Sequence, residues 1–235
     1  MAILQLTLAN LHDEINLRVW GSTSPTNSWG DTALTRQINL YLQGLGRKTA
    51  RVLQGEGVQI PEGVLHFDMW RTVGAMTETS GSATVHFPVD YDHYISFYDI
   101  THGRKLDVVE NVDKYYLDQF KWRENTAHGL ATRPGPPEAI EILGFEDNGG
   151  TWQRKALIWP ATVSGITPNI RLTYHRLPAT VSSDSDEPDI DIKYQELLIY
   201  GPILEILRDD DPSYGRYVEA ERDLLLGLAK TARAL

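Results

Sequence analysis

The chain has 235 residues, of which 41% are hydrophobic, so it is long enough to bury the core of one large domain or of two small ones. Cysteine is absent, which excludes disulfides and thiolate metal sites and suits a protein made in a reducing cytoplasm. The formal net charge of −10 argues against general nucleic-acid binding, because neutralising phosphates needs basic patches, although an acidic wall would let DNA slide past. No apolar run approaches the ~20 residues that a membrane span needs, and we expect no signal peptide.

The N-terminal residues predict two helices. Thr7 is a suitable N-cap for the first, and Trp20-Gly21 is expected to end it. Its apolar face recurs at three- and four-residue spacing and comprises Leu8, Leu11, Ile15 and Val19. After a loop over residues 22–30, Asp31 or Thr35 is expected to cap the second helix. The apolar face of the second helix comprises Leu34, Ile38, Tyr41, Leu42, Leu45, Thr49, Val52 and Leu53.

Two glycines lie inside the second predicted helix. Gly44 and Gly46 each cost about 1 kcal/mol relative to alanine in a helix interior. Either the helix breaks at these glycines or another segment of backbone packs closely against it there.

From about residue 58 the pattern changes to short runs rich in Val, Ile, Phe, Tyr and Trp, bounded by turn residues. These runs predict seven strands at residues 64–73, 83–89, 94–100, 104–109, 139–145, 152–160 and 170–176. Residues 147–150, Asp-Asn-Gly-Gly, are the strongest hairpin signal, and His102-Gly103 predicts a second turn. Helical spacing interrupts the strands at residues 111–122, and prolines within 134–137 exclude regular structure there.

The C-terminal part predicts two antiparallel helices after an acidic segment at residues 182–188. The first covers about 189–208 and the second opens at Pro212 or Ser213. Their apolar stripes comprise Tyr194, Leu197, Leu198, Gly201 and Leu204, and then Tyr214, Tyr217, Val218, Leu224, Leu225 and Leu228. The sequence therefore predicts an α+β fold in which residues 1–57 and 182–235 form a helical bundle. Residues 58–181 form an inserted antiparallel β-sandwich or barrel.

No catalytic, cofactor-binding or metal-ligating set is recognisable. A phosphate loop and a nucleophile elbow are missing, and the seven histidines form no ligand pair. His86 and His93 beside Asp90 and Asp92 invite a metal site, but polar strand and turn residues explain them better. Residues 184–195 fail the calcium-loop pattern, so an acidic linker that caps the next helix is the better interpretation.

A pair of glutamates and a group of tryptophans bear on an enzymatic or a binding role. Glu138 and Glu141 lie three apart on a predicted strand and face opposite sides, which is poor geometry for glycoside hydrolysis. Four tryptophans lie in or next to predicted strands: Trp70, Trp122, Trp152 and Trp159. If their rings were exposed they could stack on sugar, although packing in the core is the commoner role of aromatic side chains. We therefore expect no enzyme, with a hydrolase that uses carboxylates and histidine and a carbohydrate-binding module as alternatives.

Five segments together form a pattern that is typical of one protein family, namely residues 7–15, 35–39, 171–178, 194–201 and 214–222. In these segments the chain resembles the head-to-tail adaptor (connector, neck) proteins of tailed bacteriophages. These segments cover both ends of the chain, whereas the middle of the chain shares only its β-strand character with the family. Pro202 departs from the continuous helix of the family and is expected to kink it.

The resemblance implies a structural virion protein without catalysis or cofactor. Such adaptors form a ring, typically of twelve subunits, that joins the portal protein to tail or nozzle proteins. The ring lines a channel through which double-stranded DNA passes without specific binding. The protein would then be made in the host cytoplasm, reside in the phage neck and have no membrane partner. The residues expected at portal or subunit contacts are Tyr214, Tyr217, Lys230, Arg233 and Leu235. Another neck or tail ring component, such as a nozzle or tail terminator, is the nearest alternative, and a carbohydrate-binding module of the tail is a further one.

Overall fold

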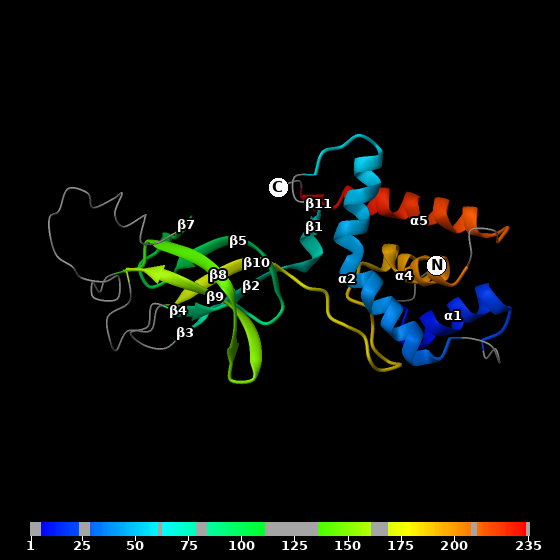
Figure 1. Cartoon of the computed structure of the whole chain (residues 1–235), viewed down its shortest axis with the longest axis horizontal. Helices are drawn as coiled ribbons and strands as arrows, with labels where there is room; N and C mark the ends of the chain where they lie inside the picture. The colour runs from blue at the N-terminus through cyan, green and yellow to red at the C-terminus, as the bar shows by residue number, and fades with distance from the viewer. Residues whose placement is uncertain are drawn as a thin grey trace. The chain divides into compact units, whose positions relative to one another are not determined.

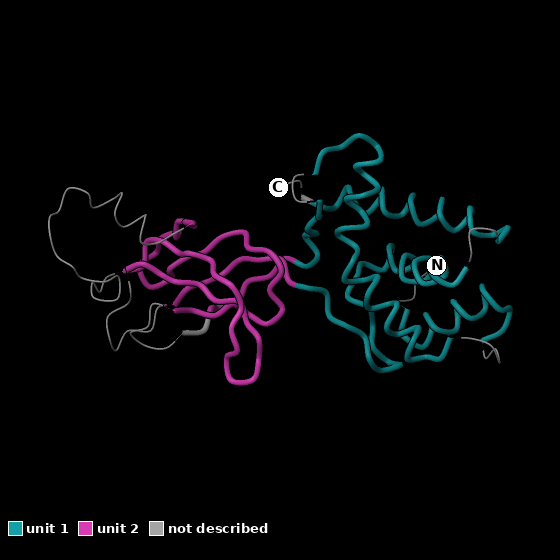
Figure 2. The backbone as a smooth tube through the Cα atoms, in the orientation of Figure 1, with its two compact units in different colours: residues 1–70, 177–235 teal, residues 71–176 magenta. Residues whose placement is uncertain are grey.

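The computed structural model describes residues 6–23, 29–60, 63–78, 84–110, 136–160, 169–207 and 211–233. The fold of these residues is α+β, as expected (Figure 1). The chain divides into two compact units, residues 1–70 with 177–235 and residues 71–176 (Figure 2). Residues 58–70 and 177–181, which were expected to belong to the β region, are part of the first unit. The predicted domains stay a prediction, because compactness alone does not measure independent folding.

Helix α1 confirms the local signals read from the sequence. It spans Leu8–Trp20, and the Thr7 hydroxyl accepts a hydrogen bond from the backbone N–H of Asn10 at 3.4 Å. Gly21 ends the helix in the left-handed conformation at φ 73°.

Helix α2 runs unbroken over Asp31–Gly55. Its N-cap is Gly30, with no side-chain cap, so the prediction that Asp31 or Thr35 caps it is wrong. Asp31 instead lies in the first turn, where its negative charge interacts favourably with the positive end of the helix dipole. A Cβ at Gly46 would overlap the carbonyl oxygen of Leu65, whose N–H donates to the Gly46 carbonyl at 3.1 Å. The close approach of the Leu65 backbone therefore explains why position 46 is a glycine.

The first C-terminal helix begins later than the spacing predicts, whereas the second opens at Ser213, as expected. A short 3₁₀ turn, η3 (Ile192–Tyr194), precedes α4 (Leu197–Ile206), and α5 (Tyr214–Ala229) follows after its N-cap Ser213. The Asp191 carboxylate accepts the N–H of Lys193 at 3.2 Å, so this residue caps the 3₁₀ turn. Pro202 lies buried inside α4, which continues to Ile206.

The four helices α1, α2, α4 and α5 share one hydrophobic core in the first unit. Gly201 of α4 lies against the Tyr41 ring of α2, where a Cβ would overlap the aromatic carbons. The same unit contains a two-stranded sheet of β1 (His66–Phe67) and β11 (Ala232–Arg233), with Phe67 opposite Ala232. The 3₁₀ turn η1 (Asp68–Trp70) follows β1 and interrupts the strand predicted over 64–73.

The second unit contains two sheets. The four-stranded sheet has the order β2 (Arg71–Ala75), β10 (Ile170–Arg176), β5 (Tyr91–Asp99) and β6 (Arg104–Lys105). The five-stranded sheet has the order β3 (Thr77–Glu78), β4 (Thr84–His86), β9 (Thr151–Trp159), β8 (Ala139–Asn148) and β7 (Asp107–Val109). Neighbouring strands are antiparallel except for β7 and β8, which are parallel. Side chains of both sheets, among them Phe97, Leu172, Val85 and Ile158, meet in one core.

Both predicted turns in the β region are confirmed. Asn148 pairs with Thr151 across Gly149 and Gly150, whose φ values of 65° and 89° are the positive angles that a two-residue hairpin turn needs to match the right-handed twist of its strands. The turn at His102-Gly103 joins β5 to β6. The helical spacing at 111–122 lies outside the described residues.

Candidate interaction surfaces

The residues expected at portal or subunit contacts do not form one patch. Tyr214 opens α5 and is half-buried, whereas Lys230 is exposed at the other end of this helix, about 24 Å away at 1.5 Å per residue. Tyr217 is buried in the helical core, where its ring lies 5.8 Å from that of Tyr200. Arg233 belongs to β11, whose backbone pairs with β1, and Leu235 lies outside the described residues.

The inner face of α5 is held by specific polar contacts. The buried Tyr41 hydroxyl donates to the Glu221 carboxylate at 2.5 Å, and the Tyr194 hydroxyl donates to the Gly227 carbonyl at 2.9 Å. Burial, followed by the negative charge of Glu221, raises the pKa of the Tyr41 hydroxyl, so it stays protonated and remains a donor. These contacts fix the rotation of α5 and leave the side chains on its outer face, such as Arg216 and Glu219, in solvent.

The acidic segment is part of the first unit rather than a loose linker. The Asp186 carbonyl accepts the N–H of Leu8 at 2.9 Å, and the Asp184 carbonyl accepts that of Ala9 at 3.2 Å. These two N–H groups open α1 and have no partner within the helix, so the segment caps α1 from a distant part of the chain. Asn39 of α2 holds the same segment, because its amide exchanges two hydrogen bonds of 2.8 Å with the backbone of Val181.

A groove of about 590 Å³ lies beside this segment. Its lining includes His12, Asp31, Thr35, Arg36 and Asp184. The His12 ring is 3.1 Å from the Thr35 hydroxyl, and burial, only partly opposed by Asp31 and Asp184, lowers its pKa. The ring therefore stays neutral at neutral pH and serves packing and hydrogen bonding.

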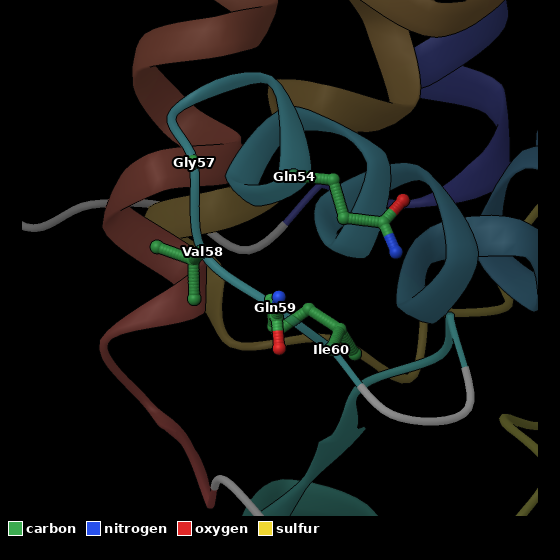
Figure 3. A pocket seen from close by; sticks show the side chains of 5 residues that line it. All are labelled: Gln54, Gly57, Val58, Gln59 and Ile60. Atoms are coloured by element: carbon green, nitrogen blue, oxygen red, sulfur yellow. The ribbon is translucent and has the colours of Figure 1, made fainter.

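A second hollow, of about 530 Å³, lies where α2 ends (Figure 3). It is lined by Gln54, Gly57, Val58, Gln59 and Ile60, none of which has a titratable side chain. These side chains supply neither an acid nor a base, so this hollow offers no catalytic chemistry.

The histidine and carboxylate pairs considered from the sequence are separated in the structure. His86 lies 2.8 Å from Glu146, whereas Asp90 accepts the Tyr174 hydroxyl at 2.8 Å. Glu138 is paired with Arg104 at 3.3 Å. Within the described ranges, no three His, Asp or Glu side chains are grouped so that they would hold a metal ion.

The tryptophans named from the sequence have different environments. Trp159 is only 1% exposed and Trp70 is also buried, so a sugar-stacking role for either ring is wrong. Trp122 lies outside the described residues. Trp152 is 69% exposed near the tip of the β8–β9 hairpin, close to Phe145, which is 64% exposed. These are the two most exposed large aromatic side chains of the described chain.

A family model named "SU10 adaptor protein" matches residues 6–234. The chain belongs to this phage head-to-tail adaptor family. No curated protein matches the chain. The family assigns the adaptor a structural rather than an enzymatic role and places it in the virion neck. In the described part of the adaptor, none of the helices combines the length and apolarity that crossing a bilayer would take.

Proposed function

We propose that this adaptor is a ring subunit that joins the portal of a phage particle to its tail. The observation that carries the proposal is the family match, which extends over residues 6–234 and so includes both ends of the chain and the β region. In this proposal the first unit is the helical bundle made from both chain ends, and the second is a β-sandwich inserted between them. A ring of twelve copies is the expected form.

The charge of the adaptor suits a channel through which DNA passes. At a net charge of −10, the subunit on average repels the phosphate backbone, so it does not favour non-specific binding of the DNA that passes. A ring of such subunits would let the genome leave without binding it.

The portal contact is proposed at the C-terminal end of α5. Lys230 is exposed there, and Arg233 follows within β11. At the other end of the helix the half-buried Tyr214 is proposed to contact a neighbouring subunit, while the buried Tyr217 packs in the helical core. Leu235 completes the proposed contact set.

The test is reconstitution of the full-length adaptor with the portal protein of the same phage, imaged by electron microscopy. We expect a closed ring below the portal. Binding to tail or nozzle proteins, with none to the portal, would instead support another neck component.

The portal contact itself is tested by Lys230→Glu in a pull-down with the portal. We expect weaker capture than with Lys193→Glu, a charge reversal at another exposed lysine of the same unit. Point variants are preferable to deleting residues 230–235, because that deletion also removes β11 and its pairing with β1. Equal capture of both variants would remove Lys230 from the contact.

A further inference from the structure

The β8–β9 hairpin carries an exposed aromatic face. Phe145 lies opposite Arg154 and Asp147 lies opposite Trp152, so these four side chains project from the same side of the hairpin. The Arg154 guanidinium lies over the Phe145 ring at 5.8 Å, whereas the Trp152 ring is 69% exposed. Exposed aromatic pairs of this kind are typical anchors of protein interfaces.

This part of the hairpin extends beyond the neighbouring strands (Figure 1). β7 pairs with β8 only at residues 139–141, and β4 pairs with β9 only at 155–157. Phe87 adds one hydrogen bond to the Arg154 carbonyl. Among the described residues, nothing pairs with the outer edges of 145–148 and 151–153. The aromatic face therefore has room for a partner.

The second unit also has a face that complements the hairpin. We call it the basic sheet face and define it by Arg71, Val73, Tyr98, Lys105 and Arg171 of the four-stranded sheet. The register aligns Tyr98 with Arg171 and with Lys105, and it aligns Arg171 with Ala75 of β2. Val73 and Arg71 follow at alternate positions of β2 and so share this side. The opposite side of the sheet holds buried core residues such as Phe97 and Leu172.

The basic sheet face combines positive charge with exposed apolar surface. Val73 is 58% and Tyr98 is 42% exposed, and all three basic side chains are exposed. The row of Ala75, Arg171, Tyr98 and Lys105 contains no acidic residue, nor does the row of Val73, Thr173 and Ser96. In a chain of net charge −10, three basic residues around an apolar centre indicate an acidic, apolar partner.

The tip of the hairpin, residues 147–152, has those properties. The exposed Trp152 lies opposite Asp147, which is the only charged residue of this tip. Arg154 lies further along the hairpin over the Phe145 ring, and Glu146, on the other side, is paired with Lys155 and His86. We propose that the hairpin tip of one adaptor binds the basic sheet face of a second copy. Because the two surfaces belong to different sheets and differ from each other, the contact is head-to-tail, which gives a ring when the rotation between successive copies closes. The inference rests on the proposed ring function and identifies its self-association surfaces.

The absence of cysteine allows a direct test by disulfide crosslinking. Val73→Cys and Trp152→Cys are introduced into separate full-length chains, which are mixed, oxidised mildly and analysed with and without the portal. We expect a crosslinked pair made of one chain of each kind, and a ladder of oligomers from the double variant. The matched control replaces Val73→Cys by Val89→Cys, a position that is at least as exposed in the same unit, at 66% against 58%, but lies outside the basic sheet face. The control is expected to crosslink severalfold less.

The outcomes separate this inference from the proposed function. Portal-bound rings in which Val73→Cys and Trp152→Cys crosslink no better than the control would overturn the self-association surfaces and leave the ring intact. A ladder from a protein that does not bind the portal would support the surfaces and contradict the portal role. Failure of both portal binding and crosslinking would reject both.

A second variant tests the aromatic anchor without cysteine. Trp152→Ser is expected to cause a severalfold loss of assembly of adaptor copies on the portal in sedimentation experiments, with an unchanged circular dichroism spectrum of the isolated chain, because this side chain lies outside the core. Val89→Ser serves as the control. Unchanged association of Trp152→Ser would exclude the hairpin as the anchor.

Discussion

At the scale of single residues, Asp186 shows how an acidic side chain can organise a turn. Its carboxylate accepts the backbone N–H groups of Ser182 at 2.7 Å and Ser183 at 2.8 Å. These hydrogen bonds favour the ionised form and lower the pKa of Asp186. This turn positions the Asp186 carbonyl so that it accepts a hydrogen bond from the first N–H of α1.

We predict that Asp186→Asn destabilises the protein at pH 7 and that the difference from the parent shrinks towards pH 3. The folded-state pKa lies below the unfolded value, so the ionised carboxylate stabilises the fold above about pH 4 and loses this effect as the pH falls. Thermal unfolding at both pH values measures the change. Glu187→Gln, at the exposed neighbouring position, is the control and should have little effect. An equal loss at both pH values would show that the charge is not responsible.

The buried hydrogen bond from Tyr41 to Glu221 gives a second prediction at this scale. Glu221→Ala leaves the hydroxyl buried without its acceptor and should cost about 1–3 kcal/mol of unfolding free energy. Glu219→Ala, an exposed position of the same helix, should stay within about 0.5 kcal/mol. Urea unfolding measures both. Similar losses in the two variants would mean that helix propensity, rather than the hydrogen bond, sets the cost.

At the scale of elements, α2 shows why identical residues in one helix have different roles. Gly46 is required because the Leu65 backbone passes against it, whereas nothing lies within 4 Å of a Cβ built on Gly44. The helix therefore tolerates two unfavourable residues, of which one allows the contact with the segment that leads into β1.

We expect opposite effects from the two alanine substitutions in α2. Gly44→Ala should stabilise the protein by up to about 1 kcal/mol, because alanine favours the helix. Gly46→Ala should destabilise it, because the backbone carbonyl of Leu65 must move. The denaturation midpoints of the two variants, compared with that of the parent, measure these opposite effects. Stabilisation by both substitutions would show that the approach of Leu65 is unimportant.

At the scale of the whole molecule, the adaptor lacks a long heptad seam or another strong signal for self-assembly in its sequence. We therefore predict that the purified chain is monomeric or weakly associated and that it forms rings on the portal. Native mass spectrometry at micromolar concentration provides the measurement. A stable dodecamer of the isolated chain would contradict this prediction, although it would agree with a strong contact at the hairpin.

Local features of this protein could be predicted well from its sequence. The start and end of α1 follow from Thr7 and Gly21, whose hydrogen bonding and left-handed backbone involve only neighbouring residues. The β8–β9 turn follows in the same way from Gly149 and Gly150. The family could also be inferred, because both ends of the chain carry its pattern.

The candidate surfaces depended on contacts between distant residues. Strand alternation shows which side chains share a side, but it does not show that β8 and β9 extend beyond their neighbours, which leaves Trp152 exposed while Trp159 is buried. The two-residue pairing of β1 with β11 has no sequence signal of its own.

By itself, the sequence determined α1, the start of α5, the two turns of the β region and the absence of any recognisable catalytic set, because these depend on residue type and short spacing. Only the tertiary structure decided that residues 184–186 cap α1, that Gly46 accommodates the Leu65 backbone, and that Trp152 and the basic sheet face are exposed. The physical reason is that burial and backbone hydrogen bonding are shared between segments that meet only when the chain has folded.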